Sequence, residues 1–86
     1  MNLSGIVVTA AASHFASVLD GLRALPGIEV HQTDEPTARI VVVQEASDIG
    51  AGMQGLQRIQ ALPHVVSAAL VYHYFDESTV ETERSP

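Results

Sequence analysis

The chain has 86 residues, of which 47% are hydrophobic, and its formal net charge is −6 with no lysine and no cysteine. This length predicts one folded domain, and the missing cysteines exclude disulfides, thiolate metal sites and a cysteine nucleophile. The four arginines are scattered and form no basic stripe, which argues against nucleic acid or an anionic membrane surface as a partner.

The first third of the chain has the pattern of a strand followed by a helix and a second strand. Residues 5–10 are mostly apolar and predict the first strand. Ser13 is a suitable N-cap for the helix, which Pro26 and Gly27 should end. Residues 28–33 alternate and predict the second strand, with Glu29 and His31 facing outward. The apolar residues at helical spacing are Phe15, Val18, Leu19, Leu22 and Leu25.

The rest of the chain repeats this order. Residues 34–38 form a proline-containing turn into residues 39–46, where four consecutive β-branched residues predict a buried strand. Asp48 can cap a helix over residues 49–62, and residues 65–74 predict the last strand. Three glycines in this helix indicate a poorly formed first turn or close packing on the sheet, more than a functional hinge. Its apolar stripe is Ile49, Met53, Leu56, Ile59 and Leu62.

A short internal sequence repeat supports this order of strands and helices. Leu25-Pro26 and Leu62-Pro63 each stand where a helix ends and an apolar strand begins. Two strand–helix–strand units joined by a hairpin predict an α+β ferredoxin-like split βαβ sandwich. Its four-stranded antiparallel sheet has the order 4-1-3-2, with two helices on one face. We expect residues 1–75 to form this domain and residues 76–86 to be an acidic, mobile tail.

Two helices can cover only one face of such a sheet, so the other face should be open. Placing the charged Arg39 and Glu45 outside also places Val41 and Val43 outside, and leaves Gln44 facing the helices. We expect the helix side to receive Ile6, Val8, Ala10, Val66, Ala68, Leu70 and Tyr72. Gly5 and Val65 should face outward. The candidate binding residues of the open face are Val7, Thr9, Val41, Val43, Glu45, Ser67, Ala69, Val71 and His73.

The sequence shows no pattern typical of catalysis. The four histidines lack metal-ligand spacing, so no metal or other cofactor is expected. No phosphate-binding glycine loop or catalytic triad is recognisable. Acylphosphatases, which share this fold, carry an arginine in the loop after the first strand, where this chain has Ala11 and Ala12. We therefore expect a protein that is not an enzyme, and pairing of two copies through their sheets remains an alternative to partner binding.

Several ordered segments resemble one family over nearly the whole chain. They are Gly5-Ile-Val-Val-Thr-Ala10, Leu25-Pro-Gly-Ile-Glu-Val30, Asp34-Glu-Pro, Val41-Val-Val-Gln-Glu-Ala46 with Asp48, and Ser67-Ala-Ala-Leu-Val-Tyr-His73. This set is similar to the NapD family, whose members are cytoplasmic chaperones for maturation of the periplasmic nitrate reductase. The family usually has an aliphatic residue where this chain has Gln44.

The resemblance implies a function as well as a ferredoxin-like fold. NapD-like proteins bind the twin-arginine signal peptide of the nitrate reductase catalytic subunit on the sheet face, and delay its export until the cofactor is loaded. Glu45, with Glu29 or tail carboxylates, is then expected to pair with the arginines. We expect a cytoplasmic monomer or weak dimer without membrane insertion. The alternative is a homo-oligomeric regulatory module of the same fold that senses small metabolites.

Overall fold

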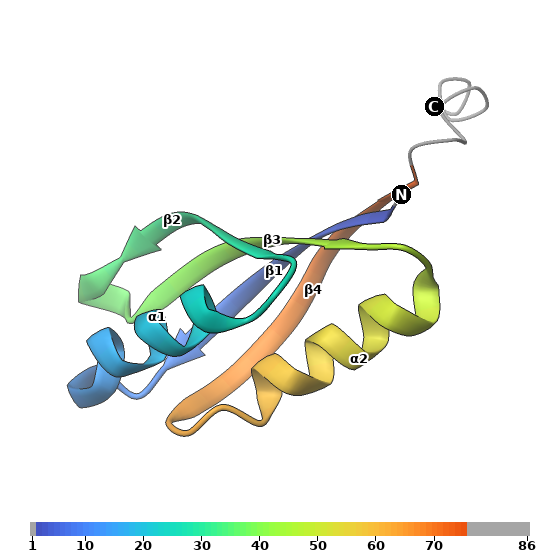
Figure 1. Ribbon diagram of the computed structural model, residues 1–86. Helices are drawn as coiled ribbons and strands as arrows, with labels where there is room; N and C mark the ends of the chain where they lie inside the picture. Colours follow the sequence, from blue (N-terminus) through green and yellow to red (C-terminus); the bar gives the residue numbers. More distant parts are fainter. Residues whose placement is uncertain (1, 76–86) are drawn as a thin grey trace.

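The computed structural model describes residues 2–75, with side chains for residues 2–72, and has the predicted architecture (Figure 1). Within this range the strands form one antiparallel sheet in the order β2-β3-β1-β4. Short 3-10 turns occupy Ala12–His14 and Glu35–Thr37. The elements are β1 (Asn2–Ala10), α1 (Phe15–Ala24), β2 (Ile28–Asp34), β3 (Arg39–Ala46), α2 (Ile49–Gln60) and β4 (Val65–Phe75). The predicted ferredoxin-like α+β fold is confirmed, and the expected tail lies outside the described residues.

Both helices lie on the same side of the sheet, and the hydrophobic core fills the space between these two layers (Figure 1). β1 and β3 occupy the middle of the sheet and supply its largest share of core side chains. The opposite face of the sheet has no covering element within residues 2–75. The large side chains with almost no exposed surface are Ile6, Val8, Val18, Leu22, Ile40, Val42 and Ile59.

The prediction of which β3 residues face the helices is correct, including the inward position of the polar Gln44. Ile40 and Val42 are fully buried under the helices, and Gln44 on the same side is only 4% exposed. The Nε2 of Gln44 donates a hydrogen bond to the carbonyl oxygen of Gly52 in α2 at 2.9 Å. Among the described residues its Oε1 has no hydrogen-bond partner, and it packs directly against Gly55. The glycines of α2 therefore allow the helix to lie close to a buried amide.

The two helices begin differently. Asp48 caps α2 as predicted, because its Oδ1 accepts a hydrogen bond from the backbone N–H of Ala51 at 2.7 Å. The cap predicted at Ser13 is wrong. Residues Ala12–His14 form a 3-10 turn, and Ser13 Oγ lies 3.1 Å from Nδ1 of His14. The α1 helix starts at Phe15 without a side-chain cap.

The start of β4 departs from strict alternation. A register shift between Thr9 and Ala10 of β1 pairs Ala10 with Val65 and leaves Val66 as an extra residue of β4. Val65 packs against the core, while Val66 is 67% exposed. The predicted inward position of Val66 and outward position of Val65 are therefore wrong. No residue in this apolar run indicates a bulge, so the alternation of the sequence could not predict the extra residue.

Candidate functional site

The open face of the sheet is the candidate site, and its centre is a floor of valines. Val7 of β1 lies opposite Val41 of β3, and Gly5 lies opposite Val43. Paired residues of an antiparallel sheet project from the same face, so these side chains share the face that the helices leave uncovered. We call Val7, Val41 and Val43 the valine floor. Each of the three is partly buried, in contrast to the fully buried residues that alternate with them.

β4 continues this floor with small side chains. Ser67 pairs with Thr9, and Ala69 pairs with Val7, so both face the open side as predicted. Both are exposed, and neither rises far above the backbone. The surface over β1, β3 and the middle of β4 is therefore low and apolar, with hydroxyl groups only at its end. Such a surface can receive a helix or an extended segment lying across it.

Tyr72 stands over this floor, although its bulk suggested a core position. A second register shift, between Gly5 and Ile6, pairs Tyr72 with Gly5. A Cβ atom on Gly5 would collide with the Tyr72 ring, which shows that the ring occupies the space above this glycine. The ring is 51% exposed. Tyr72 therefore belongs to the open face, and its predicted inward position is wrong.

The same register shift changes how the predicted site residues Val71 and His73 are placed opposite β1. Val71 is the extra residue between Leu70, which pairs with Ile6, and Tyr72, and it is 55% exposed. His73 pairs with Ser4, a buried residue of the helix-covered side, so this register gives no support to an outward position. The side chain of His73 lies outside the described residues.

One end of the valine floor carries two carboxylates around a shallow hollow. Glu29 of β2 pairs with Val43, and Glu45 lies two residues further along β3. The backbone holds this corner together, since the N–H of Glu45 donates to the carbonyl oxygen of Gly27 at 2.9 Å. Gly27 has φ of 77°, a conformation that favours glycine. We call this the acidic hollow; its lining residues are Leu3, Gly27, Ile28, Glu29, Val43 and Glu45.

The other end of the floor has a second hollow with a different charge pattern. A bulge in β2 places Gln32 opposite Val41, so Gln32 and not His31 borders the floor there. His31 is exposed, as expected for an outward residue, but it is the extra residue of this bulge and has no partner in β3. We call this the arginine hollow; its lining residues are Val7, Gln32, Thr33, Asp34, Arg39 and Val41.

The open face thus has the chemistry of a recognition surface. Arg39 and Glu45 stand six residues apart on β3, roughly 20 Å at the rise of a strand, with the valine floor between them. Among the described side chains, no group of three or more histidines or carboxylates is placed to hold a metal ion. No helix within residues 2–75 is long and apolar enough to cross a membrane. Noncovalent binding of an apolar segment with a cationic end suits this face.

Three residues of this face were not predicted from the sequence. Leu3 was missed because β1 begins at Asn2, earlier than the predicted residue 5. Gln32 and Tyr72 reach the face only through bulges. One signal for Tyr72 was present, since a glycine inside a strand often marks a bulge or a close neighbour, and Gly5 is such a residue.

Comparison with known proteins places the chain in a family. The family model described as NapD protein matches residues 1–77. The chain belongs to the NapD family. It is 32% identical over 77 residues to the protein named Chaperone NapD from Escherichia coli K12, and equally to that from Shigella flexneri, covering 90% of this chain and 88% of each relative. The solution structure of the E. coli Tat proofreading chaperone protein NapD superimposes with a TM-score of 0.78, covering 98% of this chain and 88% of that one at 32% identity.

Membership of the NapD family confirms two expectations from the sequence. The resemblance to this family is correct, and it extends over nearly the whole chain. The relatives are named as chaperones, so the expected non-enzymatic role is confirmed as well. The alternative of a metabolite-sensing module finds no support among these NapD relatives.

Proposed function

We propose that this NapD protein binds the twin-arginine signal peptide of the periplasmic nitrate reductase catalytic subunit. It would act in the cytoplasm and delay export until the subunit has folded around its cofactor. The family match supports this role, as does the structural neighbour, whose title names a Tat proofreading chaperone. The particular client and the delay of export are what the family resemblance implies.

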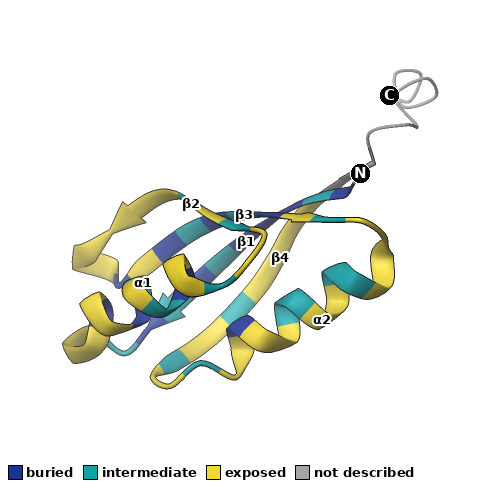
Figure 2. Ribbon diagram, in the orientation of Figure 1, coloured by how far each residue is buried: buried dark blue, intermediate teal, exposed yellow. Residues whose placement is uncertain are grey.

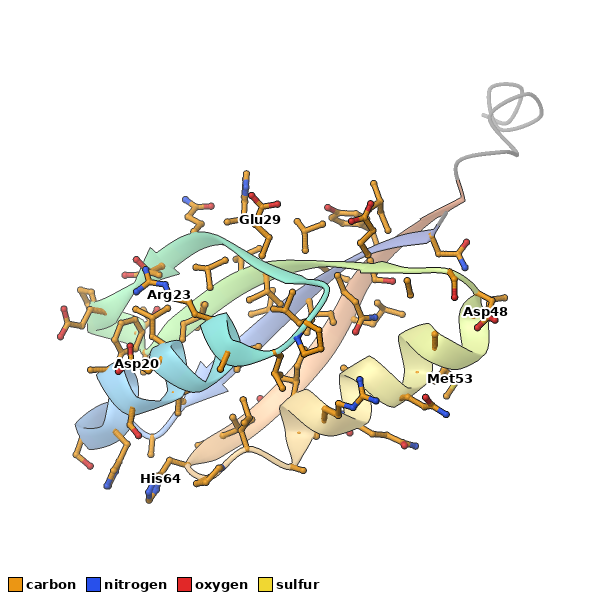
Figure 3. The ribbon with its side chains drawn as sticks, in the orientation of Figure 1. Asp20, Arg23, Glu29, Asp48, Met53 and His64 are labelled. Carbon is orange, nitrogen blue, oxygen red and sulfur yellow. The ribbon has the colours of Figure 1, made fainter. Side chains whose placement is uncertain are left out.

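One observation carries the proposal: the acidic hollow adjoins an apolar floor on a face that nothing in residues 2–75 covers. A twin-arginine signal peptide has the complementary order, with two guanidinium groups beside an apolar segment. Figure 3 shows Glu29 projecting on the side of the sheet away from the two helices. Guanidinium–carboxylate pairs are strong and directional when they are bidentate, so Glu29 and Glu45 would hold the arginines. The valine floor would receive the apolar segment.

The proposed contact surface comprises Glu29, Tyr72 and the sequence-predicted residues other than His73. A flexible peptide that becomes ordered on binding loses several kcal/mol of its gross interaction energy, so apolar burial has to exceed that loss. The tyrosine ring, half exposed above Gly5, adds a large apolar surface next to the small residues of β4. The contact residues we propose are Val7, Thr9, Glu29, Val41, Val43, Glu45, Ser67, Ala69, Val71 and Tyr72.

Calorimetric titration with synthetic peptides tests the function directly. The protein is titrated at low salt with the twin-arginine signal peptide and with the same peptide carrying alanine in place of both arginines. We expect tight binding of the first peptide and clearly weaker binding of the second. Absence of binding for both would contradict the chaperone proposal. Equal binding would leave the apolar floor in place and remove the role of the acidic hollow.

Variants of the face locate the site. Val43→Asp and Val71→Asp should abolish peptide binding while the protein stays folded, because a charge is then introduced beneath an apolar segment. Ala16→Asp is a matched control, since Ala16 is exposed on α1, on the other side of the sheet. Circular dichroism before each titration confirms that the variant is folded. Unchanged peptide affinity in both valine variants would place the binding site elsewhere.

A further inference from the structure

The exposed large hydrophobic residues among the described side chains all lie on α2 or on the edge strand β4, and two of them, Val71 and Tyr72, also belong to the open face. Figure 2 shows β4 mostly exposed beside α2, while the middle strands carry the buried residues. Each of these exposed side chains keeps about half or more of its surface in contact with solvent. Within the described side chains they are Ile49, Met53, Val66, Leu70, Val71 and Tyr72, all on α2 or β4. An apolar cluster of this kind marks an interaction surface.

A hydrogen bond from Gln60 shows how α2 is turned relative to this edge. The Nε2 of Gln60 donates to the carbonyl oxygen of Ala68 in β4 at 3.3 Å. At 3.6 residues per turn, Ile49, Met53 and Gln60 lie on one stripe of the helix. This stripe therefore faces the outer edge of β4, and Ile49 and Met53 flank that edge on the helix side of the sheet. The core stripe of α2, which contains Ile59, lies beside it.

β4 is an edge strand that has no charged or proline residue to prevent pairing with another chain, although its two bulges and the Gln60 side chain protect part of the edge. Among the described strands it pairs only with β1, although it is 11 residues long. The bond to Gln60 shows that Ala68 directs its carbonyl group away from β1. Residues 65–75 contain no lysine, acidic residue or proline. The other edge, β2, is only 7 residues long, contains Glu29 and Asp34, and is followed closely by Pro36.

Charge favours a second copy of this chain as the occupant of the edge. Two molecules with a net charge of −6 repel each other, but the ten acidic residues are absent between Asp48 and Asp76. Arg58 is the only arginine in that interval. Two copies can therefore approach through β4 and α2 with only one described carboxylate beside the contact, Asp48, whose Oδ1 accepts a hydrogen bond at the start of α2.

We propose that this edge forms a homodimer in which β4 pairs antiparallel with β4 of a second copy. Full overlap of residues 65–75 places Leu70 opposite its own counterpart, and the sheets join into one. Ile49 and Met53 of the two α2 helices then cover the junction on the helix side. Gln60 competes with this pairing, because its side chain holds the Ala68 carbonyl that the second strand would use. The valine floor takes no part in this strand pairing, although Val71 and Tyr72 of β4 lie close to both surfaces.

Analytical ultracentrifugation over a concentration series tests the dimer in the absence of peptide. The wild-type protein should dimerise reversibly, and Leu70→Lys should be monomeric, because two ammonium groups would meet at the two-fold axis. Leu70→Glu alone should also be monomeric, whereas an equimolar mixture of the lysine and glutamate variants should form a heterodimer. Gln60→Ala should tighten the dimer about five-fold, the value of one exposed hydrogen bond. His31→Lys, an exposed position on the opposite edge, is the matched control and should dimerise like wild type.

Two further measurements separate loss of the dimer from misfolding of a variant and from loss of peptide binding. Ile49→Lys changes only the helix flank and should weaken the dimer without touching a strand, which covers the case that a Leu70 variant misfolds. Leu70→Lys should still bind the signal peptide, so failure of the dimer and failure of the chaperone function are distinguishable. A protein that is monomeric at every concentration would overturn the proposal. A dimer that persists in folded Leu70→Lys, or a mixture without heterodimer, would also overturn it.

Discussion

The two faces of β3 carry nearly the same side chains but have opposite roles. Ile40 and Val42 are fully buried against the helices, whereas Val41 and Val43 are only partly buried on the open face. Composition alone does not separate these pairs, since all four are β-branched and apolar. Their environment separates them, because the helices cover one face only (Figure 2). An uninterrupted apolar run is therefore compatible with a strand that has one core face and one binding face.

The covered face should tolerate less change than the open face because its central side chains are fully buried. On the covered side even the polar Gln44 is enclosed, with its amide placed against Gly52 and Gly55. On the open side Tyr72 lies over Gly5 but keeps half of its ring in solvent. Similar substitutions on the two faces should therefore have different costs, and this difference can be measured.

The largest contrast is expected between Val42→Asp and Val43→Asp. Val42 is fully buried, so Val42→Asp places an unpaired carboxylate in the core and should lower the free energy of unfolding by more than about 4 kcal/mol. Val43→Asp can leave its carboxylate in solvent and should cost about 1–2 kcal/mol. Urea unfolding followed by circular dichroism measures both. If the variants lose the same stability, the assignment of the two faces is wrong.

A glycine substitution tests the packing of the covered face. Alanine in a helix interior is normally about 1 kcal/mol more favourable than glycine. In Gly55→Ala the new methyl group would run into Oε1 of Gln44, so this variant should instead lose about 2 kcal/mol. The matched control is Gly50→Ala, where the new Cβ would meet only Asp48 Oδ1 at 3.5 Å. That control should be neutral or more stable.

Combining Gly55→Ala with Gln44→Ala identifies the cause. If contact with the amide is responsible, the double variant should be more stable than the sum of the two single effects predicts. Thermal unfolding of all four proteins gives this coupling. Simple additivity would show that Gly55→Ala destabilises α2 for a reason other than Gln44.

The corresponding glycine of the open face should tolerate the same change better. In Gly5→Ala the methyl group meets the Tyr72 ring, but this half-exposed ring can turn toward solvent. We expect a loss of about 1 kcal/mol, smaller than that of Gly55→Ala. Tyr72→Ala combined with Gly5→Ala should remove this loss, as measured by urea unfolding. A larger cost at Gly5 than at Gly55 would reverse the comparison of the two faces.

The sequence predicted the covered face more accurately than the open one. Order, sheet topology and the alternation of β1 and β3 follow from apolar periodicity, because one face of each strand must be buried. The inward position of Gln44 could also be predicted from the sequence, since the charged Arg39 and Glu45 had to face solvent. Bulges in β2 and β4 could not be predicted, because one extra residue leaves an apolar or polar run unchanged in composition.

These bulges explain the errors at the candidate site. They bring Gln32 and Tyr72 to the open face and remove the expected alternation at Val66. α2 also differs from expectation, since Ile49 and Met53 belong to its apolar stripe by sequence but are exposed. Periodicity identifies which side chains share a stripe, whereas only the packing of α2 against β4 decides how much of the stripe is covered. The unexpected exposure is what reveals the second edge surface.

The smallest expected effect concerns the charges of the open face. Glu29→Gln with Glu45→Gln keeps the shape of the acidic hollow and removes its charge. Exposed ion pairs contribute about 0.2–1 kcal/mol each, so the loss of two pairs should lower signal-peptide affinity by about two- to thirty-fold. The salt dependence of binding should fall with it, because fewer charges are then paired between protein and peptide.

A control with the same change in net charge decides whether this effect is local. Asp20→Asn with Glu35→Gln removes the same two charges from exposed positions on α1 and on the turn before β3. If the acidic hollow holds the arginines, this control should keep near wild-type affinity at physiological salt in calorimetric titrations. Equal losses in the two double variants would mean that the peptide responds to the overall negative charge. The valine floor would then be the specific element of the open face, and the carboxylates would act only as a general attraction.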